Sequence, residues 1–236
     1  MNGLFKHAGL ACCLIAALTL PGCKGCAPIK AKTVELLPSA PLKTGTKGTA
    51  GLEGACLRAG KVPPSSFAPA ANEMLVGFDN FFRKGTPPLP CHDIRVAVFR
   101  GGVVFDLSQF DSVASARLRF DVARSVSRSG GETVSSSPPK SHATTLGMAT
   151  QPFSSAMNFD NEATLPSAPN LDLMVSSQVR SWVDKERPNF GFVVAGPTGL
   201  PDKSNLPRNN DAQVTFYRNF RLEVMYNPER NPRAPQ

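Results

Sequence analysis

Hydrophobic and polar residues alternate with a period of two along much of this chain. Residues 116–122 place Ala, Leu, Phe and Val on one face and two Arg and an Asp on the other, and residues 220–226 repeat the pattern. Such alternation predicts β-strands with one buried and one solvated face. Gly, Pro or Asn turn signals separate four further predicted strands, at residues 95–99, 103–107, 190–195 and 214–217.

One segment has a helical period instead. Residues 175–183 carry three Val and the only Trp of the chain at positions i, i+4, i+7 and i+8, which is one face of a short helix. Ser176 or Ser177 is expected to cap its start, and Pro188 prevents it from continuing. We therefore expect Trp182 to face the core.

The pattern divides the chain into four parts. Residues 1–22 form a signal peptide, and residues 23–70, with six Pro and six Gly, are expected to form a flexible tether. Residues 71–228 form the predicted β-domain, and residues 229–236 a disordered tail. Within the domain, the Ser/Pro-rich stretch 123–170 is too long for one loop and is expected to contain one or two edge strands.

The signal peptide ends in a sequence that resembles a bacterial lipobox. A short cationic start is followed by an apolar run that is too short to span a membrane as a mature helix. The run ends in Leu20-Pro21-Gly22-Cys23. This resemblance implies cleavage after Gly22, lipidation of Cys23 and a bacterial lipoprotein anchored by its acyl chains. Lys24, in place of an Asp, favours the outer membrane; the alternative is an ordinary signal peptide followed by a chance Cys.

The cysteine count fits an oxidising compartment. The chain has six Cys, of which two leave with the signal peptide and Cys23 takes the lipid. Of the three that remain, we favour a disulfide between Cys56 and Cys91, which leaves Cys26 free or paired with another molecule.

Several short motifs occur in a definite order along the predicted domain. Residues 99–108 contain Arg-x-x-x-x-Phe-Asp-Leu-Ser, and residues 189–194 contain Asn-Phe-Gly-Phe. Together with residues 113–122, 171–182, 215–217 and 222–226, these motifs resemble, in sequence and order, those of DNRLRE-type domains. The resemblance implies an antiparallel β-sandwich of jelly-roll type, which some members use as a carbohydrate-binding module for extracellular polysaccharide.

Sugar binding requires exposed aromatic faces beside planar hydrogen-bonding groups. Phe81, Phe82 and Arg83 form the first candidate loop, because adjacent Phe side chains on a strand cannot both point inward. The alternative is that one Phe is core and the other covers a sheet edge. Asp79-Asn80, just before them, could supply oxygen ligands to a structural calcium, or simply form a turn.

Two other groups of residues are candidates. Arg117 and Arg119 lie on the outward face of a predicted strand, where they could bind uronate carboxylates or form an ordinary solvated face. Tyr217 and Arg218, near the C-terminal hairpin, are a third suggestion.

Charge and motifs narrow the function. The chain has 26 basic and 18 acidic residues, a net charge of +8, but no motif of nucleic-acid readers, so we expect no nucleic-acid partner. It shows no catalytic constellation or cofactor motif, so we expect no enzyme and no cofactor. The Cys23-x-x-Cys26 spacing resembles that of metal ligands, but a lipidated Cys23 cannot supply a thiolate.

The sequence therefore predicts a lipid-anchored lipoprotein that binds cell-envelope or extracellular polysaccharide. The alternatives are a structural or assembly lipoprotein that binds an envelope protein and, third, an unrecognised enzyme.

Overall fold

A computed structural model describes eight stretches of the chain. These are residues 31–53, 65, 67–84, 92–129, 132–135, 144–154, 157–196 and 210–235. All of them belong to one compact unit, Ala31–Gln236. The predicted signal peptide, the lipidation site Cys23 and the predicted Cys56–Cys91 disulfide lie outside the described residues.

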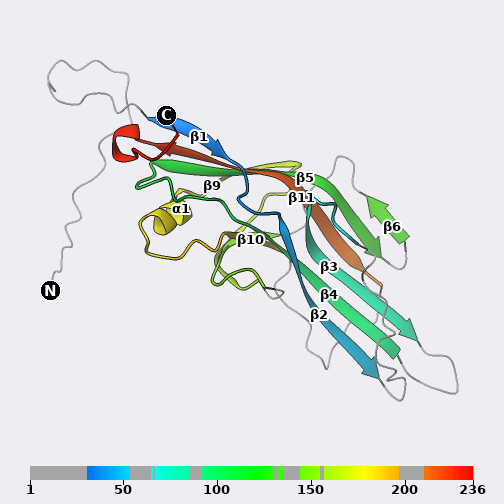
Figure 1. Cartoon of the computed structure of the whole chain (residues 1–236). Helices are drawn as coiled ribbons and strands as arrows, with labels where there is room; N and C mark the ends of the chain where they lie inside the picture. The colour runs from blue at the N-terminus through cyan, green and yellow to red at the C-terminus, as the bar shows by residue number, and fades with distance from the viewer. Residues whose placement is uncertain are drawn as a thin grey trace, which may run out of the picture. The chain divides into compact units, whose positions relative to one another are not determined.

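The described residues form a curled antiparallel β-sheet with one short α-helix (Figure 1). This confirms the predicted all-β, sandwich-like fold. The strands are β1 (Lys32–Leu36), β2 (Lys43–Glu53), β3 (Met74–Lys84), β4 (His92–Val103), β5 (Ser115–Ser129), β6 (Glu132–Ser135), β7 (Thr145–Ala149), β8 (Phe159–Thr164), β9 (Asn170–Met174), β10 (Phe192–Ala195) and β11 (Ala212–Tyr226). The helices are α1 (Ser176–Val183) and the 3-10 turn η2 (Pro228–Arg230).

The main strand order is β6-β5-β11-β3-β4-β10-β7-β8. β1 also pairs with β11, β2 with β4, and β9 with β5, so the long strands change partners along their length. Strands that bend and change partners allow one sheet to fold over onto itself. We expected one or two edge strands within residues 123–170. β6 and β8 lie there, at the two ends of the main strand order, and β7 lies between β10 and β8.

β5 and β11, the two longest strands, lie side by side along most of their length (Figure 1). Their register shifts twice, between Phe216 and Tyr217 and between Arg218 and Arg221. Asn219, inside the second shift, has a positive φ of 56°, as bulge residues often do. The shifts send both Tyr217 and Phe220 to the main core, although simple alternation would separate them.

Aromatic and aliphatic side chains from both ends of the domain fill this core. The ring of Phe120 stacks on Phe220 with centroids 4.6 Å apart and meets Tyr217 edge-on at 5.3 Å. Beside them, Leu118 and Leu222 face each other from β5 and β11 and are fully buried. Burying each such side chain contributes about 1.5–3 kcal/mol, so these contacts stabilise the pairing of β5 with β11.

Helix α1 closes one side of the core, as predicted from its period. Val179 and Trp182 are buried, and the Trp182 ring meets Phe192 edge-on at 4.7 Å. The predicted Ser cap is wrong: the helix has no side-chain cap. The hydroxyl of Ser176 instead accepts the backbone N–H of Ala116 at 3.0 Å, which joins the helix to β5.

The structure moves the expected domain boundaries at both ends. β1 and β2 lie within residues 23–70, where we expected a tether. They join the sheet because backbone pairing with β11 and β4 needs few bulky side chains, and Val34 and Leu36 still pack on the core. The expected tail 229–236 contains part of η2 and the fully buried Asn231.

The predicted strand 103–107 is also absent, apart from Val103 at the end of β4. The carbonyl of Val104 accepts the backbone N–H of Ser39 at 2.9 Å, in the connection between β1 and β2. Residues 104–107 therefore form a loop whose Phe105 and Leu107 still point into the core.

A buried ion pair joins β3 and β5 away from the main core. Asp79 is fully buried and its carboxylate pairs with Arg128, whose side chain is 17% exposed. The other carboxylate oxygen accepts the hydroxyl of Ser65 at 2.7 Å, and Arg128 Nε donates to the carbonyl of Asn210 at 2.6 Å. Removing one partner of such a pair leaves an uncompensated buried charge.

We expect Arg128→Met to lower the free energy of unfolding by about 3–5 kcal/mol, because the buried Asp79 carboxylate loses the guanidinium that pairs with it. The matched control is Arg119→Met, since Arg119 is 40% exposed and its ion pairs contribute at most about 1 kcal/mol. Urea denaturation of both variants measures the difference. Equal losses in the two variants would contradict the assignment.

Candidate functional site

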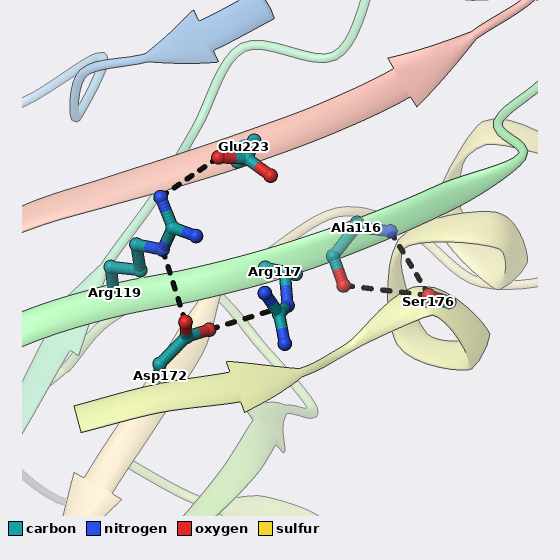
Figure 2. Close-up of polar contacts among 6 residues, drawn as sticks. All are labelled: Ala116, Arg117, Arg119, Asp172, Ser176 and Glu223. Atoms are coloured by element: carbon teal, nitrogen blue, oxygen red, sulfur yellow. Dashed lines mark hydrogen bonds and ion pairs between the residues drawn. The ribbon is translucent and has the colours of Figure 1, made fainter. Parts of the chain in front are cut away.

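Arg117 and Arg119 lie on the outward face of β5, between β9 and β11 (Figure 2). Arg119 donates to Glu223 at 2.8 Å and to Asp172 at 3.3 Å. Arg117 approaches the other oxygen of Asp172 at 3.4 Å. Both arginines are thus held by carboxylates of neighbouring strands, as Figure 2 shows.

The same face continues to β1, where Arg221 donates to Glu35 at 3.2 Å. We call this surface the arginine face. Its paired charges are Arg117, Arg119, Arg221, Glu35, Asp172 and Glu223. Three positive and three negative groups leave no net charge, so the arginine face offers little electrostatic attraction to an acidic polymer. The contacts therefore favour a cross-strand stabilising role for these arginines.

The predicted Phe81–Arg83 loop is part of strand β3. Phe81 lies opposite Arg95 and Phe82 opposite Ile94 of β4. Both rings are half-buried, and the backbone N–H of Phe82 donates to the side-chain oxygen of Asn210 at 2.8 Å. Arg83 lies opposite Asp93 in the same ladder. Adjacent strand residues point to opposite faces of the sheet, so the two rings do not form one binding surface.

The structure separates the third pair of candidates. Tyr217 is fully buried, and its hydroxyl lies 3.0 Å from the Thr144 hydroxyl. Its ring presents no face to solvent, which corrects the suggestion that it contacts a ligand. Arg218 is exposed opposite Asp121.

Asp79 does not fit the suggested calcium ligand. Both of its carboxylate oxygens are already occupied, one by Arg128 and the other by Ser65. Within the part of the chain that the structure describes, no group of three or more His, Cys, Asp or Glu residues is arranged to hold a metal ion.

A cleft of about 860 Å³ is lined by residues of the loop that follows β4 and of the end of helix α1. It is referred to below as the cleft. The apolar part of the lining includes Phe105, Phe110 and Trp182. The polar part is about as large and consists of Ser39, Asp106, Ser108, Asp111, Asp184, Lys185, Asn189 and Arg233. The volume lies in the range of small-molecule sites, and the lining is more polar than that of most of them.

The side chain of Asn189 fixes the geometry of the cleft. Its amide nitrogen donates to the carbonyl of Phe105 at 2.9 Å, and its oxygen accepts the backbone N–H of Gly191 at 3.1 Å. Gly191 has a φ of +93°, and a Cβ there would lie 2.3 Å from the Val103 carbonyl oxygen. The position therefore requires glycine, and the Asn-aromatic-Gly motif has a structural explanation.

The C-terminal segment contributes Arg233 to the lining of the cleft. Asn231 is fully buried, and its side-chain oxygen accepts the backbone N–H groups of Asp111 at 2.7 Å and Ser112 at 2.9 Å. Arg233 pairs with the Asp111 carboxylate. These contacts hold the loop that carries Asp111 against the segment that follows β11.

Asp106 is an exposed carboxylate with a fixed orientation. It accepts the backbone N–H of Ser108 at 2.9 Å. This bond, together with the Ser108 hydroxyl, holds the pKa of Asp106 below its ordinary value. The group is therefore an ionised hydrogen-bond acceptor at neutral pH.

Sequence reasoning did not identify the cleft, although the motifs contained a signal for it. The Phe-Asp-Leu-Ser motif, Trp182 and Asn189 all line it. They lie far apart in the sequence, and only the fold brings them together.

A scan of protein-family models finds no match to this chain, and a search of curated proteins finds no relative either. The DNRLRE resemblance therefore stays an expectation from the motifs. Among the described residues, no helix has the length and apolar character needed to cross a membrane.

We expect the pKa of Asp106, followed by ¹³C NMR of the carboxyl carbon, to be lower in the folded than in the urea-unfolded chain. The carboxylate then stabilises the fold above the unfolded-state pKa, and this contribution is lost as pH falls through the folded-state pKa. Ser108→Ala should raise the folded-state pKa only partway, because the stronger backbone donor remains. Equal pKa values in the two states would refute the assigned hydrogen bonds.

Proposed function

We propose that this protein is a lipid-anchored lipoprotein of the bacterial cell envelope, in the outer membrane, and that its β-sandwich binds polysaccharide in the cleft. The Leu20-Pro21-Gly22-Cys23 sequence supports the anchor, and the DNRLRE-like motifs support the ligand class. The single observation that carries the proposal is the cleft itself, where motif residues from three separate segments meet.

The lining of the cleft suits a sugar chain. Sugars present apolar C–H faces beside hydroxyl groups that both donate and accept hydrogen bonds. Phe105, Phe110 and Trp182 match the apolar part, while the Asp106 carboxylate and the Lys185 ammonium group supply an acceptor and a donor. The charges of the arginine face already pair with one another.

The position of β1 in the sequence limits the distance between such an anchor and the start of the sheet. Only eight residues, 24–31, lie between Cys23 and Lys32. A chain of this length spans at most about 30 Å when fully extended. A lipid on Cys23 would therefore keep the sheet close to the membrane surface, where envelope polysaccharide is within reach.

One observation favours the alternative of an assembly lipoprotein with a protein partner. Met174 and Met225 are large apolar side chains on the same side of the sheet as the arginine face, 63% and 39% exposed. Leu37, directly after β1, is 68% exposed. Exposed apolar groups beside paired charges are typical of protein contact surfaces.

The anchor has a direct test. Intact mass spectrometry of the membrane-extracted protein should show a chain that begins at Cys23 and carries acyl groups. A Cys23→Ser variant should stay unprocessed and lack this mass increase. An unlipidated wild-type chain that retains residues 1–22 would overturn the anchor.

The cleft is tested by filling it. Ser39→Trp places a large ring at the cleft and should abolish binding of the detergent-extracted full chain on a glycan array, because the ring occupies the space for the sugar. Leu37→Trp is the matched control, since this position lies two residues away and does not line the cleft. Absence of any wild-type glycan binding would overturn the polysaccharide proposal. If both variants bind glycan as well as the wild type does, the cleft is excluded as the binding site.

A further inference from the structure

We propose that the cleft selects neutral over acidic polysaccharides and that Lys185 is a specificity-determining contact at its rim. This inference rests on the proposed function and adds the chemical class of the ligand.

The charged groups that line the cleft are three carboxylates and two cations. Asp111 and Arg233 pair with each other, which leaves Asp106, Asp184 and Lys185. Within the described residues, none of these three forms an ion pair, so their net charge of −1 faces the solvent and the ligand. With two carboxylates and one ammonium group, this part of the cleft repels uronate, sulfate or phosphate groups. Neutral ligand hydroxyls, in contrast, can form hydrogen bonds with all three side chains.

Hydrogen bonding strengthens the same preference. The carboxylate of Asp106 is held by Ser108 and stays ionised, so it remains an acceptor for a ligand hydroxyl. An acidic ligand group has no proton to donate to it at neutral pH. Binding such a group would therefore leave a carboxylate of the cleft without compensation, which is the repulsive element that gives selectivity.

The backbone conformation of Lys185 is the second observation. It follows α1 directly after Asp184 and has a φ of +61°, in the left-handed region. Its backbone N–H donates to the carbonyl of Trp182 at 3.2 Å and closes the end of the helix. Glycine is the usual residue at such a helix end, and another residue costs about 1 kcal/mol in strain.

Lysine at this position thus reduces stability and gains no ion pair within the described fold. Its ammonium group is, however, the one described cation of the cleft lining that is not already paired. Residues with strained backbone conformations cluster at ligand-binding and active sites. In the cleft, the Lys185 ammonium group can donate a hydrogen bond to a ligand hydroxyl, beside the two acceptor carboxylates.

Lys185→Gly separates stability from binding. We expect this variant to unfold at a higher temperature, because glycine relieves the strain, and to bind its neutral polysaccharide about tenfold more weakly or worse, because a charged hydrogen bond is lost. Lys185→Arg keeps a cationic donor and should retain most of the affinity. Asn219→Gly is the matched control, because Asn219 also has a positive φ but lies in the β11 bulge. The affinity of this variant for the polysaccharide should match that of the wild type.

The ligand class is tested with neutral and acidic polymers that share a backbone. The pairs are hydroxyethyl-cellulose with carboxymethyl-cellulose, and dextran with dextran sulfate. Affinity electrophoresis of the detergent-extracted full chain should show retardation by the neutral polymer of at least one pair and weaker retardation by its acidic counterpart.

Each contrary result has its own meaning. Preference for an acidic polymer would overturn the selectivity and leave polysaccharide binding intact. A Lys185→Gly variant that is more stable and binds as well as the wild type would overturn the contact. Failure of every polymer here and of every glycan on the array would remove the proposed function, and this inference with it.

Discussion

The pairing of β5 with β11 is the constraint on which the rest of the structure depends. Each strand has 15 residues, and together they carry β1, β3, β6 and β9 on their outer edges. Their register shifts turn the pair so that one half faces the main core and the other the smaller cluster around Phe216. A regular ladder would place either Tyr217 or Phe220 on the wrong side of the sheet.

This pairing also decides what the outward residues can do. Alternation places Arg117 and Arg119 on the solvent side of β5, and the registers of β9 and β11 place Asp172 and Glu223 beside them. The arginine face is therefore a product of sheet formation, and its charges are paired before any ligand arrives. The cleft arises where the sheet ends and irregular segments pack against α1, which is where loops carried by a rigid scaffold commonly bind ligands.

The sequence predicted the parts of the fold that depend on local periodicity. The alternation at residues 116–122 and 220–226 and the helical spacing around Trp182 correspond to β5, β11 and α1. It failed where tertiary contacts decide. β1 and β2 are held by pairing with distant strands, and Asn231 is buried by hydrogen bonds to residues more than a hundred positions away.

The candidate site was harder to predict for the same reason. A period of two identifies which residues point outward, and it correctly placed Arg117 and Arg119 there, but it cannot reveal their partners on other strands. The lining of the cleft comes from residues 39, 104–111, 182–189 and 233, which no local pattern connects. The order of the motifs indicated a common fold, but it did not indicate that these segments share a cleft.

Backbone amide NMR shifts during a titration with a neutral polysaccharide test the central claim most directly. The account predicts that the shifts change for residues 104–111 and 182–189, around the cleft, while those of residues 115–121 on the arginine face stay constant. Changes confined to β5, β9 and β11, with the cleft residues unaffected, would contradict it.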